Sequence, residues 1–142
     1  MEDDDDDYVD PLDEYFELTD KALKAAFKVH TYCGPGLLES AYQECLRFEL
    51  QRSGFDVQTE VPMSLSCYGN VLDKAYIIDL LVDKTLVIEL KSVENLQRVH
   101  RYQVKTYLRF GNFPIGLLLN FNTEHLKDGL MRVKNGHYRK PA

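Results

Sequence analysis

The stretch AYIIDLLVDKTLVIELK, residues 75–91, decides the fold. It contains two apolar runs with the length and composition of buried strands, separated by the polar residues 83–85. So short a connection predicts an antiparallel pair. With a three-residue loop Asp79 lies opposite Glu89 on one face of the sheet, whereas a two-residue turn places Asp79 opposite Ile88 on the other face. Because the loop lacks the Gly or Asn that three-residue loops prefer, a β-bulge is the alternative, and the register stays open at this stage.

Helical and strand-like patterns continue on both sides of this pair. Apolar residues at helical spacing predict helices over residues 15–32, 37–52 and 95–110. Strand-like runs cover residues 57–68, 71–82, 86–93 and 113–121. The last of these is almost wholly apolar and is expected inside the sheet, while residues 130–141 fit a short helix, an edge strand or a loose tail. The order predicts one α/β domain over residues 15–142, with a central mixed sheet of four to five strands flanked by helices.

The charge of the chain is unevenly distributed. The 142 residues carry a net charge of −6, but residues 1–14 hold nine acids and no base, which leaves fourteen acids against seventeen bases in the remainder. A run of like charges repels itself and buries nothing, so residues 1–14 are predicted to be a disordered acidic tail. We interpret it as a solvated tail that aids solubility; the alternative is that it mimics nucleic acid over a basic surface.

Several classes of protein are poorly supported by the sequence. No apolar run approaches the roughly 20 residues needed to cross a bilayer, and the acidic start is the opposite of a secretion signal. We therefore expect no membrane association and a cytoplasmic location. The three cysteines, Cys33, Cys45 and Cys67, lack CxxC spacing, which gives little support to a disulfide framework, a zinc ribbon or an iron-sulfur cluster.

Three acidic residues stand where the surrounding pattern calls for apolar side chains. Asp79 is the only charge in the first apolar run, and an unpaired charge is costly in a buried strand. Glu89 and Lys91 share one face of the next strand because side chains alternate with a period of two. Glu39 lies in the first turn of the predicted second helix, on its apolar stripe, and is expected to face inward. Together these side chains form a candidate catalytic cluster.

Such a cluster fits a divalent metal ion. Converging carboxylates repel each other unless a cation lies between them. Oxygen ligands suit Mg²⁺ or Mn²⁺, here from Asp79, Glu89, Glu39 and the main-chain carbonyl of Leu90. The metal would acidify a bound water and polarise a phosphoryl oxygen, while Lys91 would orient the water or stabilise charge on the phosphate. The structural alternatives are that Glu39 only favours the helix dipole and that Glu89 and Lys91 form a ladder pair on a half-exposed strand.

The predicted third helix has features that fit a nucleic-acid substrate. Gln103 and Tyr107 lie one turn apart, and Tyr102 or Tyr107 is a candidate for stacking on a base. Basic residues beside the metal would hold a phosphate backbone. The candidate nucleic-acid-binding residues are therefore Gln103, Tyr107, Arg98, Arg101 and Lys105. The alternative is that these bases form an ordinary solvated face and that Tyr107 belongs to the core.

These residues resemble a known family. Residues 36–42, GLLESAY, match the motif GxxExxY, and Asp79 with Glu-Leu-Lys at residues 89–91 is similar to the D…ExK arrangement of the PD-(D/E)XK nuclease superfamily. Gln103 and Tyr107 look like the QxxxY element of its RecB-like branch. Residues 118–135 resemble the end of GxxExxY family proteins. The resemblance covers about residues 15–136, with Ile78 where the superfamily label has a proline, a departure that is common among relatives.

The resemblance implies a restriction-endonuclease-like core and divalent-metal hydrolysis of phosphodiester bonds. It assigns Asp79 and Glu89 as metal ligands, Lys91 as the catalytic lysine, and Glu39 as an additional acidic residue of the site. The leading hypothesis is a Mg²⁺- or Mn²⁺-dependent nuclease acting on DNA rather than RNA, as a homodimer or with a partner protein. The first alternative is a catalytically silent nuclease-like module that binds nucleic acid or protein. A second alternative is an internal ion-pair network in which Lys91 bonds to both carboxylates.

Overall fold

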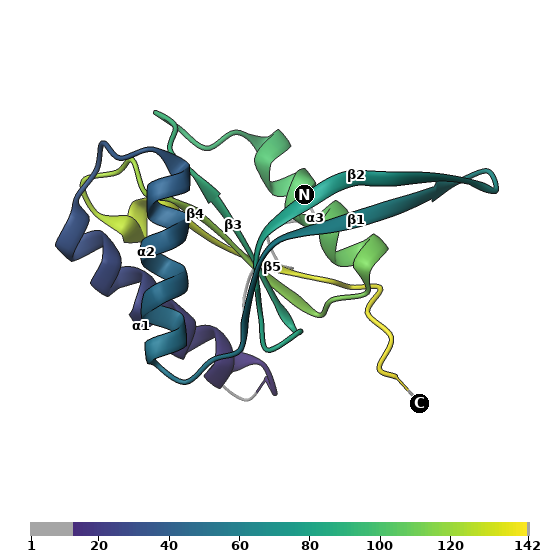
Figure 1. Ribbon diagram of the computed structural model, residues 1–142, viewed down its shortest axis with the longest axis horizontal. Coiled ribbons are helices and arrows are strands. Elements are labelled where there is room, and N and C mark those ends of the chain that lie inside the picture. Colours follow the sequence, from purple (N-terminus) through teal and green to yellow (C-terminus); the bar gives the residue numbers. More distant parts are fainter. Residues whose placement is uncertain (1–12, 142) are drawn as a thin grey trace.

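The computed structural model describes residues 13–141, which form one mixed five-stranded sheet with helices packed on both faces (Figure 1). The strands follow the order β1-β2-β3-β4-β5. They are β1 (Val57–Cys67), β2 (Asn70–Val82), β3 (Leu86–Lys91), β4 (Ile115–Asn120) and β5 (Leu130–Lys134). The helices are α1 (Phe16–Cys33), α2 (Glu39–Arg52), α3 (Arg98–Gly111) and the short 3₁₀ helix η2 (Leu126–Gly129). The predicted α/β architecture with a central mixed sheet of four to five strands is confirmed, with five strands.

The connection between β2 and β3 has three residues, the length that places Asp79 and Glu89 on one face of the sheet. β2 pairs antiparallel with β3, and the pair nearest the loop joins Val82 to Leu86. In the loop, Asp83 and Lys84 take the left-handed backbone conformation, with φ of 50° and 54°. The Asp83 carboxylate accepts the N–H of Asp56 at 2.9 Å, and the N–H of Asp83 donates to the carbonyl of Asp56 at 2.8 Å. These bonds hold the loop without the expected Gly or Asn, and the ladder between β2 and β3 needs no bulge.

The second half of the sheet contains the only parallel pair among the described strands. β4 runs parallel to β3, which requires a crossover connection, and this connection contains α3. Every residue of β4 is buried, which confirms its predicted interior position. β5 pairs antiparallel with β4 at the edge of the sheet. Of the three possibilities for the end of the chain, the edge strand is the one that forms over Leu130–Lys134.

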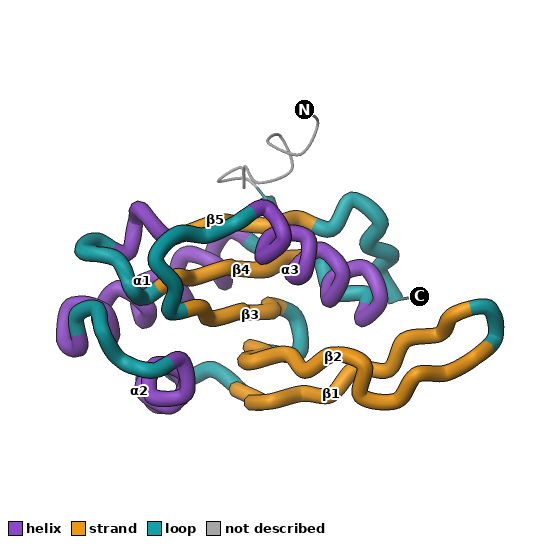
Figure 2. Tube along the Cα trace, turned by 90° about the horizontal axis from the view of Figure 1, so that it is seen from above, coloured by secondary structure: helices purple, strands orange, loops and turns teal. Residues whose placement is uncertain are grey.

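The hairpin of β1 and β2 extends well beyond the rest of the sheet, as Figure 2 shows. β2 pairs with β1 along most of its length, but with β3 only from Leu80 to Val82. Within the hairpin the register shifts between Met63 and Leu65. β2 therefore leaves β3 at Asp79, so this residue lies at the point where the sheet divides rather than in the middle of a continuous ladder.

Two hydrophobic cores lie on the two faces of the sheet. One lies beneath α1 and α2 and includes Ala22, Leu46 and Ile88. The other lies beneath α3 and includes Val87 and Val104. Since side chains alternate along a strand, Glu89 and Lys91 extend toward the same face as Val87, beneath α3. The candidate catalytic residues of β3 therefore belong to the α3 side of the sheet.

Two helices begin later than the apolar spacing predicted. α2 begins at Glu39 rather than at residue 37, because Gly36 has a φ of 106° and Leu38 is extended. α3 begins at Arg98 rather than at residue 95. The residue before it, Gln97, is extended, and its N–H donates to Nδ1 of His100 at 2.9 Å as part of a capping box.

The first described residues form ion pairs with the C-terminal part of the chain. Residues 1–12 of the predicted tail lie outside the described residues, whereas Asp13 and Glu14 are ion-paired with Lys134 and Lys140, at 3.3 Å and 2.8 Å. None of the helices within residues 13–141 has the length and apolar character needed to span a bilayer.

Candidate active site

Asp79 and Glu89 meet where β2 separates from β3. The register that joins Leu80 to Ile88, continued by one residue, places Asp79 opposite Glu89. Oδ2 of Asp79 accepts the main-chain N–H of Leu90 at 2.9 Å, which draws the carboxylate onto β3. Glu89 is 4% exposed and Asp79 is half-buried. The two strands therefore bring both predicted carboxylates to one place, as expected for a three-residue loop between them.

Burial dominates the electrostatics of this pair. Loss of solvent, followed by the charge of Asp79, raises the pKa of Glu89 to about 8, although Lys91 opposes the shift. Burial also raises the pKa of Asp79, while the amide of Leu90 acts in the opposite direction. Each carboxyl influences the ionisation of the other. The charged form of Glu89, which burial and the charge of Asp79 both disfavour, is the form that a cation in this site would stabilise.

Lys91 neutralises this negative charge only in part. Its Nζ lies 3.0 Å from Oε2 of Glu89, and its side chain is 16% exposed. Oε1 of Glu89 is buried and has no hydrogen-bond partner within the described residues. A buried carboxylate oxygen without a partner is costly. The unpaired Oε1 and the carboxylate of Asp79 are hard oxygen donors in one site, so the residues present fit a divalent cation such as Mg²⁺.

Glu39 is placed differently from the sequence-based expectation. It is the first residue of α2 and its side chain is exposed, so the expectation that it faces inward is wrong. Its Oε1 accepts the N–H of Ser92 at 3.1 Å, immediately after β3. The charge of Glu39 contributes to the raised pKa of Asp79. Within residues 13–141, however, no three His, Cys, Asp or Glu side chains form a group that could hold a metal.

The GxxExxY segment fixes the loop that precedes Glu39. Tyr42 is fully buried and stacks on Phe121, with ring centroids 4.6 Å apart. Its hydroxyl donates to the carbonyl of Gly34 at 2.5 Å and accepts the N–H of Leu37 at 3.1 Å. Ser92 Oγ donates to the carbonyl of Leu37 at 2.9 Å. The tyrosine of the motif therefore holds the turn against the residue that follows Lys91.

Helix α3 contributes a buried tyrosine to the site. Tyr107 is 2% exposed and packs edge-on against Tyr76, with ring centroids 5.6 Å apart. Burial and then the charges of Glu89 and Asp79 raise the pKa of Tyr107, and a hydrogen bond from Gln103 opposes them. Tyr107 is thus part of the core, as the structural alternative stated, and its ring is not exposed for stacking on a base.

The predicted basic face of α3 is divided between the interior and the surface. Arg101 is 7% exposed and lies on the buried side of the helix with Val104. Arg98 is exposed and Lys105 is half-buried. The three cations therefore do not form one continuous solvated surface, because Arg101 lies on the stripe of α3 that packs on the sheet.

Two polar residues that the sequence did not single out as functional hold the end of β3. Asn120, the last residue of β4, is 1% exposed. Its Oδ1 accepts the N–H of Val93 at 3.1 Å, and its Nδ2 donates to the carbonyl of Val93 at 2.9 Å. Ser92 bonds to Glu39 and Leu37 as described. The signal available in the sequence was an amide that directly follows an apolar run in a predicted interior strand.

A comparison with protein families agrees with this geometry. The sequence model of the family described as PD-(D/E)XK nuclease superfamily matches residues 16–133. The match includes both carboxylates, Lys91, the GxxExxY segment and α3, and the five-stranded α/β fold is consistent with a restriction-endonuclease-like core. No curated protein and no solved structure matches the chain.

Proposed function

The chain belongs to the PD-(D/E)XK nuclease superfamily, and on this premise we propose that it is a metal-dependent nuclease that hydrolyses phosphodiester bonds of nucleic acid. The observation that carries the proposal is the buried Oε1 of Glu89, which has no partner within residues 13–141 although the carboxylate of Asp79 lies beside it. A protein with no use for the site would gain stability by replacing this carboxyl with an apolar side chain. A divalent cation would remove the same penalty.

The proposed ligands are Asp79, Glu89 and the main-chain carbonyl of Leu90, with Glu39, whose Oε1 accepts the N–H of Ser92 in the structure, as the additional acidic group. When bound, Mg²⁺ or Mn²⁺ supplies Lewis-acid activation of the phosphate and a water of lowered pKa. Lys91 is held in the site by Glu89, with Nζ 3.0 Å from Oε2. There its ammonium group would orient the attacking water and stabilise the charge that develops on the phosphate.

Residues around the carboxylates would exclude water from the site and fix the main chain that carries Lys91. Tyr107 and Tyr76 pack against each other beneath α3 and limit solvent beside Glu89, and exclusion of water strengthens the electrostatic interactions within a site. Lys91 ends β3, and after it the main-chain N–H groups of Ser92 and Val93 donate to Glu39 and Asn120. The ammonium group therefore extends from a segment whose main chain is fixed on both sides.

The finer assignments are also proposals. The segment GLLESAY and the pair Gln103 and Tyr107 support membership of the GxxExxY family within the RecB-like branch. DNA is the proposed substrate, and cooperation with a second copy or a partner protein is proposed because residues 13–141 offer little beyond the sheet and its helices. A cytoplasmic location stays a prediction from the sequence.

The proposal is tested by cleavage assays on DNA and RNA, with Mg²⁺ or Mn²⁺ and with EDTA. Asp79→Asn, Glu89→Gln and Lys91→Ala should each lower the cleavage rate at least about a hundredfold, because each removes a ligand or the charge-stabilising group. Glu124→Gln removes one charge from an exposed position and serves as the matched control. Circular dichroism establishes that each variant is folded. Equal cleavage by the wild type and the three site variants would contradict the proposal.

The two alternatives make different predictions. A catalytically silent module would bind nucleic acid equally well in EDTA and would cleave none with either metal. The ion-pair network requires Lys91 to bond to both carboxylates. In the structure Lys91 pairs with Glu89, whereas Asp79 accepts the amide of Leu90. This arrangement favours the nuclease hypothesis over the ion-pair network.

A further inference from the structure

A pocket of about 320 Å³ lies between α3 and the segment that follows β5. Its two walls are joined by hydrogen bonds. The side-chain amide of Asn135 donates to the carbonyls of Leu108 and Phe113, both at 3.0 Å, and that of Asn112 donates to the carbonyl of Arg139 at 2.9 Å. Figure 2 shows the C-terminal end lying near the end of α3. The pocket is therefore a defined feature of the fold.

The pocket is lined by cationic side chains from both walls. These cations are Lys105 and Arg109, one turn apart on α3, and Lys134 on β5. No acidic side chain lines the pocket within the described residues. Lys134 does have an acidic neighbour outside the lining, with Nζ 3.3 Å from Oδ2 of Asp13. A concave site with this charge would attract an anion such as a backbone phosphate.

Two exposed aromatic rings lie among these cations. Tyr102 and Phe110 both line the pocket and are 41% and 50% exposed. The guanidinium carbon of Arg109 lies 5.9 Å from the centroid of the Phe110 ring. Aromatic rings beside cations are typical of sites that bind unpaired bases, because stacking requires the face of the base. In a duplex the faces of the bases are covered by their neighbours, so the combination favours a single strand.

The position of the pocket relates it to the candidate active site. Tyr102, Lys105 and Arg109 follow one another along one side of α3. Tyr107 lies on the adjacent, buried side of the same helix, where the charges of Glu89 and Asp79 reach it. The helix therefore carries the pocket on one side and borders the catalytic carboxylates on the other.

We propose that this pocket is a non-catalytic binding site for a single-stranded segment of nucleic acid. A backbone phosphate would lie between Arg109 and Lys134, and a base would stack on Tyr102 or Phe110. The inference rests on the proposed nuclease function and extends it, since it states which form of nucleic acid is bound and where the strand lies outside the catalytic carboxylates.

The test measures binding to the full chain in EDTA, so that cleavage does not interfere. The probes are a fluorescent single-stranded oligothymidylate of about 20 nucleotides and a blunt duplex of similar length, followed by fluorescence anisotropy. Tyr102→Ala should raise Kd for the single strand about fivefold or more and leave the weaker duplex binding unchanged, and Tyr102→Phe should restore wild-type affinity. Arg109→Ala should raise Kd about three- to tenfold and reduce the slope of log K against log salt by about 0.7.

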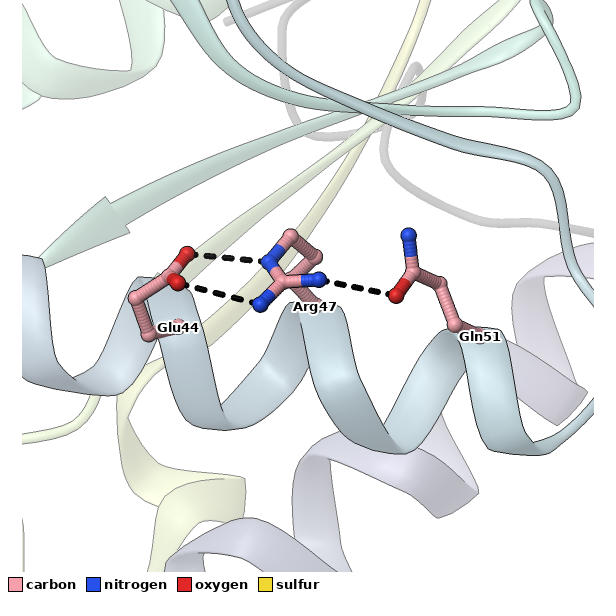
Figure 3. Close-up of polar contacts among 3 residues, drawn as sticks. All are labelled: Glu44, Arg47 and Gln51. Atoms are coloured by element: carbon pink, nitrogen blue, oxygen red, sulfur yellow. Dashed lines mark hydrogen bonds and ion pairs between the residues drawn. The ribbon is translucent and has the colours of Figure 1, made fainter.

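A matched charge control is available on the opposite face of the sheet. Figure 3 shows Arg47 on α2 with both of its polar neighbours. Its Nε and Nη2 donate to the carboxylate of Glu44, both at 3.0 Å, and its Nη1 donates to Oε1 of Gln51 at 2.8 Å. Arg47→Ala removes the same charge as Arg109→Ala from a site that is already neutralised. It should leave Kd for both probes unchanged.

The outcomes separate this inference from the proposed nuclease function. Three results would overturn the pocket assignment. They are wild-type affinity in both Arg109→Ala and Tyr102→Ala, equal losses of single-strand and duplex affinity in Tyr102→Ala, and no binding of either probe to the wild type. A result in which deletion of residues 1–12 abolishes the effect of Arg109→Ala would also overturn it, because the acidic segment rather than nucleic acid would then occupy the pocket. The nuclease function is decided separately by the effect of Asp79→Asn on cleavage.

Discussion

Replacement of Glu89 by Gln is expected to remove a pH dependence of folding stability. Burial, and then the charge of Asp79, raise the pKa of Glu89 to about 8, from an ordinary value of 4.5. A carboxyl whose pKa is raised by folding stabilises the folded state fully below its unfolded pKa, and this contribution is lost as the pH rises through the folded pKa. In EDTA, the free energy of unfolding of the wild type should therefore fall as the pH rises from 4.5 to about 8.

The size of the effect follows from the same linkage. One pKa unit corresponds to about 1.4 kcal/mol, so a change from 4.5 to about 8 sets an upper limit of about 5 kcal/mol. At 4% exposure Glu89 is screened little by solvent. The titratable groups that face it are Asp79, Lys91 and Tyr107. Because Glu89→Gln also loses the ion pair with Lys91, we expect the variant to exceed the wild type by about 2 kcal/mol near pH 9.

The assay is urea unfolding followed by circular dichroism between about pH 5 and pH 9 in EDTA. Glu124→Gln removes the same charge from an exposed position and should keep the wild-type slope. Addition of Mg²⁺ or Mn²⁺ near pH 8 should restore stability to the wild type and not to Glu89→Gln, because a ligand that binds only the folded state stabilises it. A wild type of equal stability across this range, or an unchanged slope in Glu89→Gln, would refute the reasoning.

Two further substitutions test the packing that supports the site. Tyr42→Phe keeps the ring but removes the hydroxyl that bonds to the loop before α2, including the N–H of Leu37. It should lower the free energy of unfolding, measured in urea, by about 1–3 kcal/mol. A negligible loss would show that the loop is held in another way. A Cβ at Gly129 would lie 2.6 Å from the carbonyl oxygen of Asn120, so Gly129→Ala should cost about 1–3 kcal/mol and lower Tm, whereas Gly136→Ala, with no atom within 4 Å, should be neutral.

The register that forms between β2 and β3 is one of those that the sequence left open. A three-residue loop makes Asp79 and Glu89 opposite partners, and only that register gives both carboxylates one face. The sequence could not choose this register because it did not show how the loop forms without Gly or Asn. The structure answers this through Asp83, whose main chain and carboxylate both bond to Asp56, twenty-seven positions earlier in the chain. Such a contact depends on the folded arrangement and has no local pattern.

Exposure was the property that the sequence predicted least well. Helical spacing placed Glu39 on an apolar stripe, but the stripe becomes buried only from Tyr42 onward, since α2 begins at Glu39. Arg101 was expected among solvated bases, yet it lies on the packed side of α3 with Val104. Periodicity gives the order of faces around a helix. It does not give the angle at which the helix docks or the residue at which packing begins.

The main chain directly after Lys91 is held by two segments that are distant in sequence. Ser92 bonds to Glu39 and Leu37, at the start of α2. Val93 bonds through both main-chain polar groups to Asn120 at the end of β4. A residue held by several independent hydrogen bonds loses little entropy on binding substrate, because its conformation is already fixed. The GxxExxY segment and Asn120 therefore act on the proposed chemistry through the main chain after β3. Their loss should displace Lys91 while both carboxylates stay on the sheet.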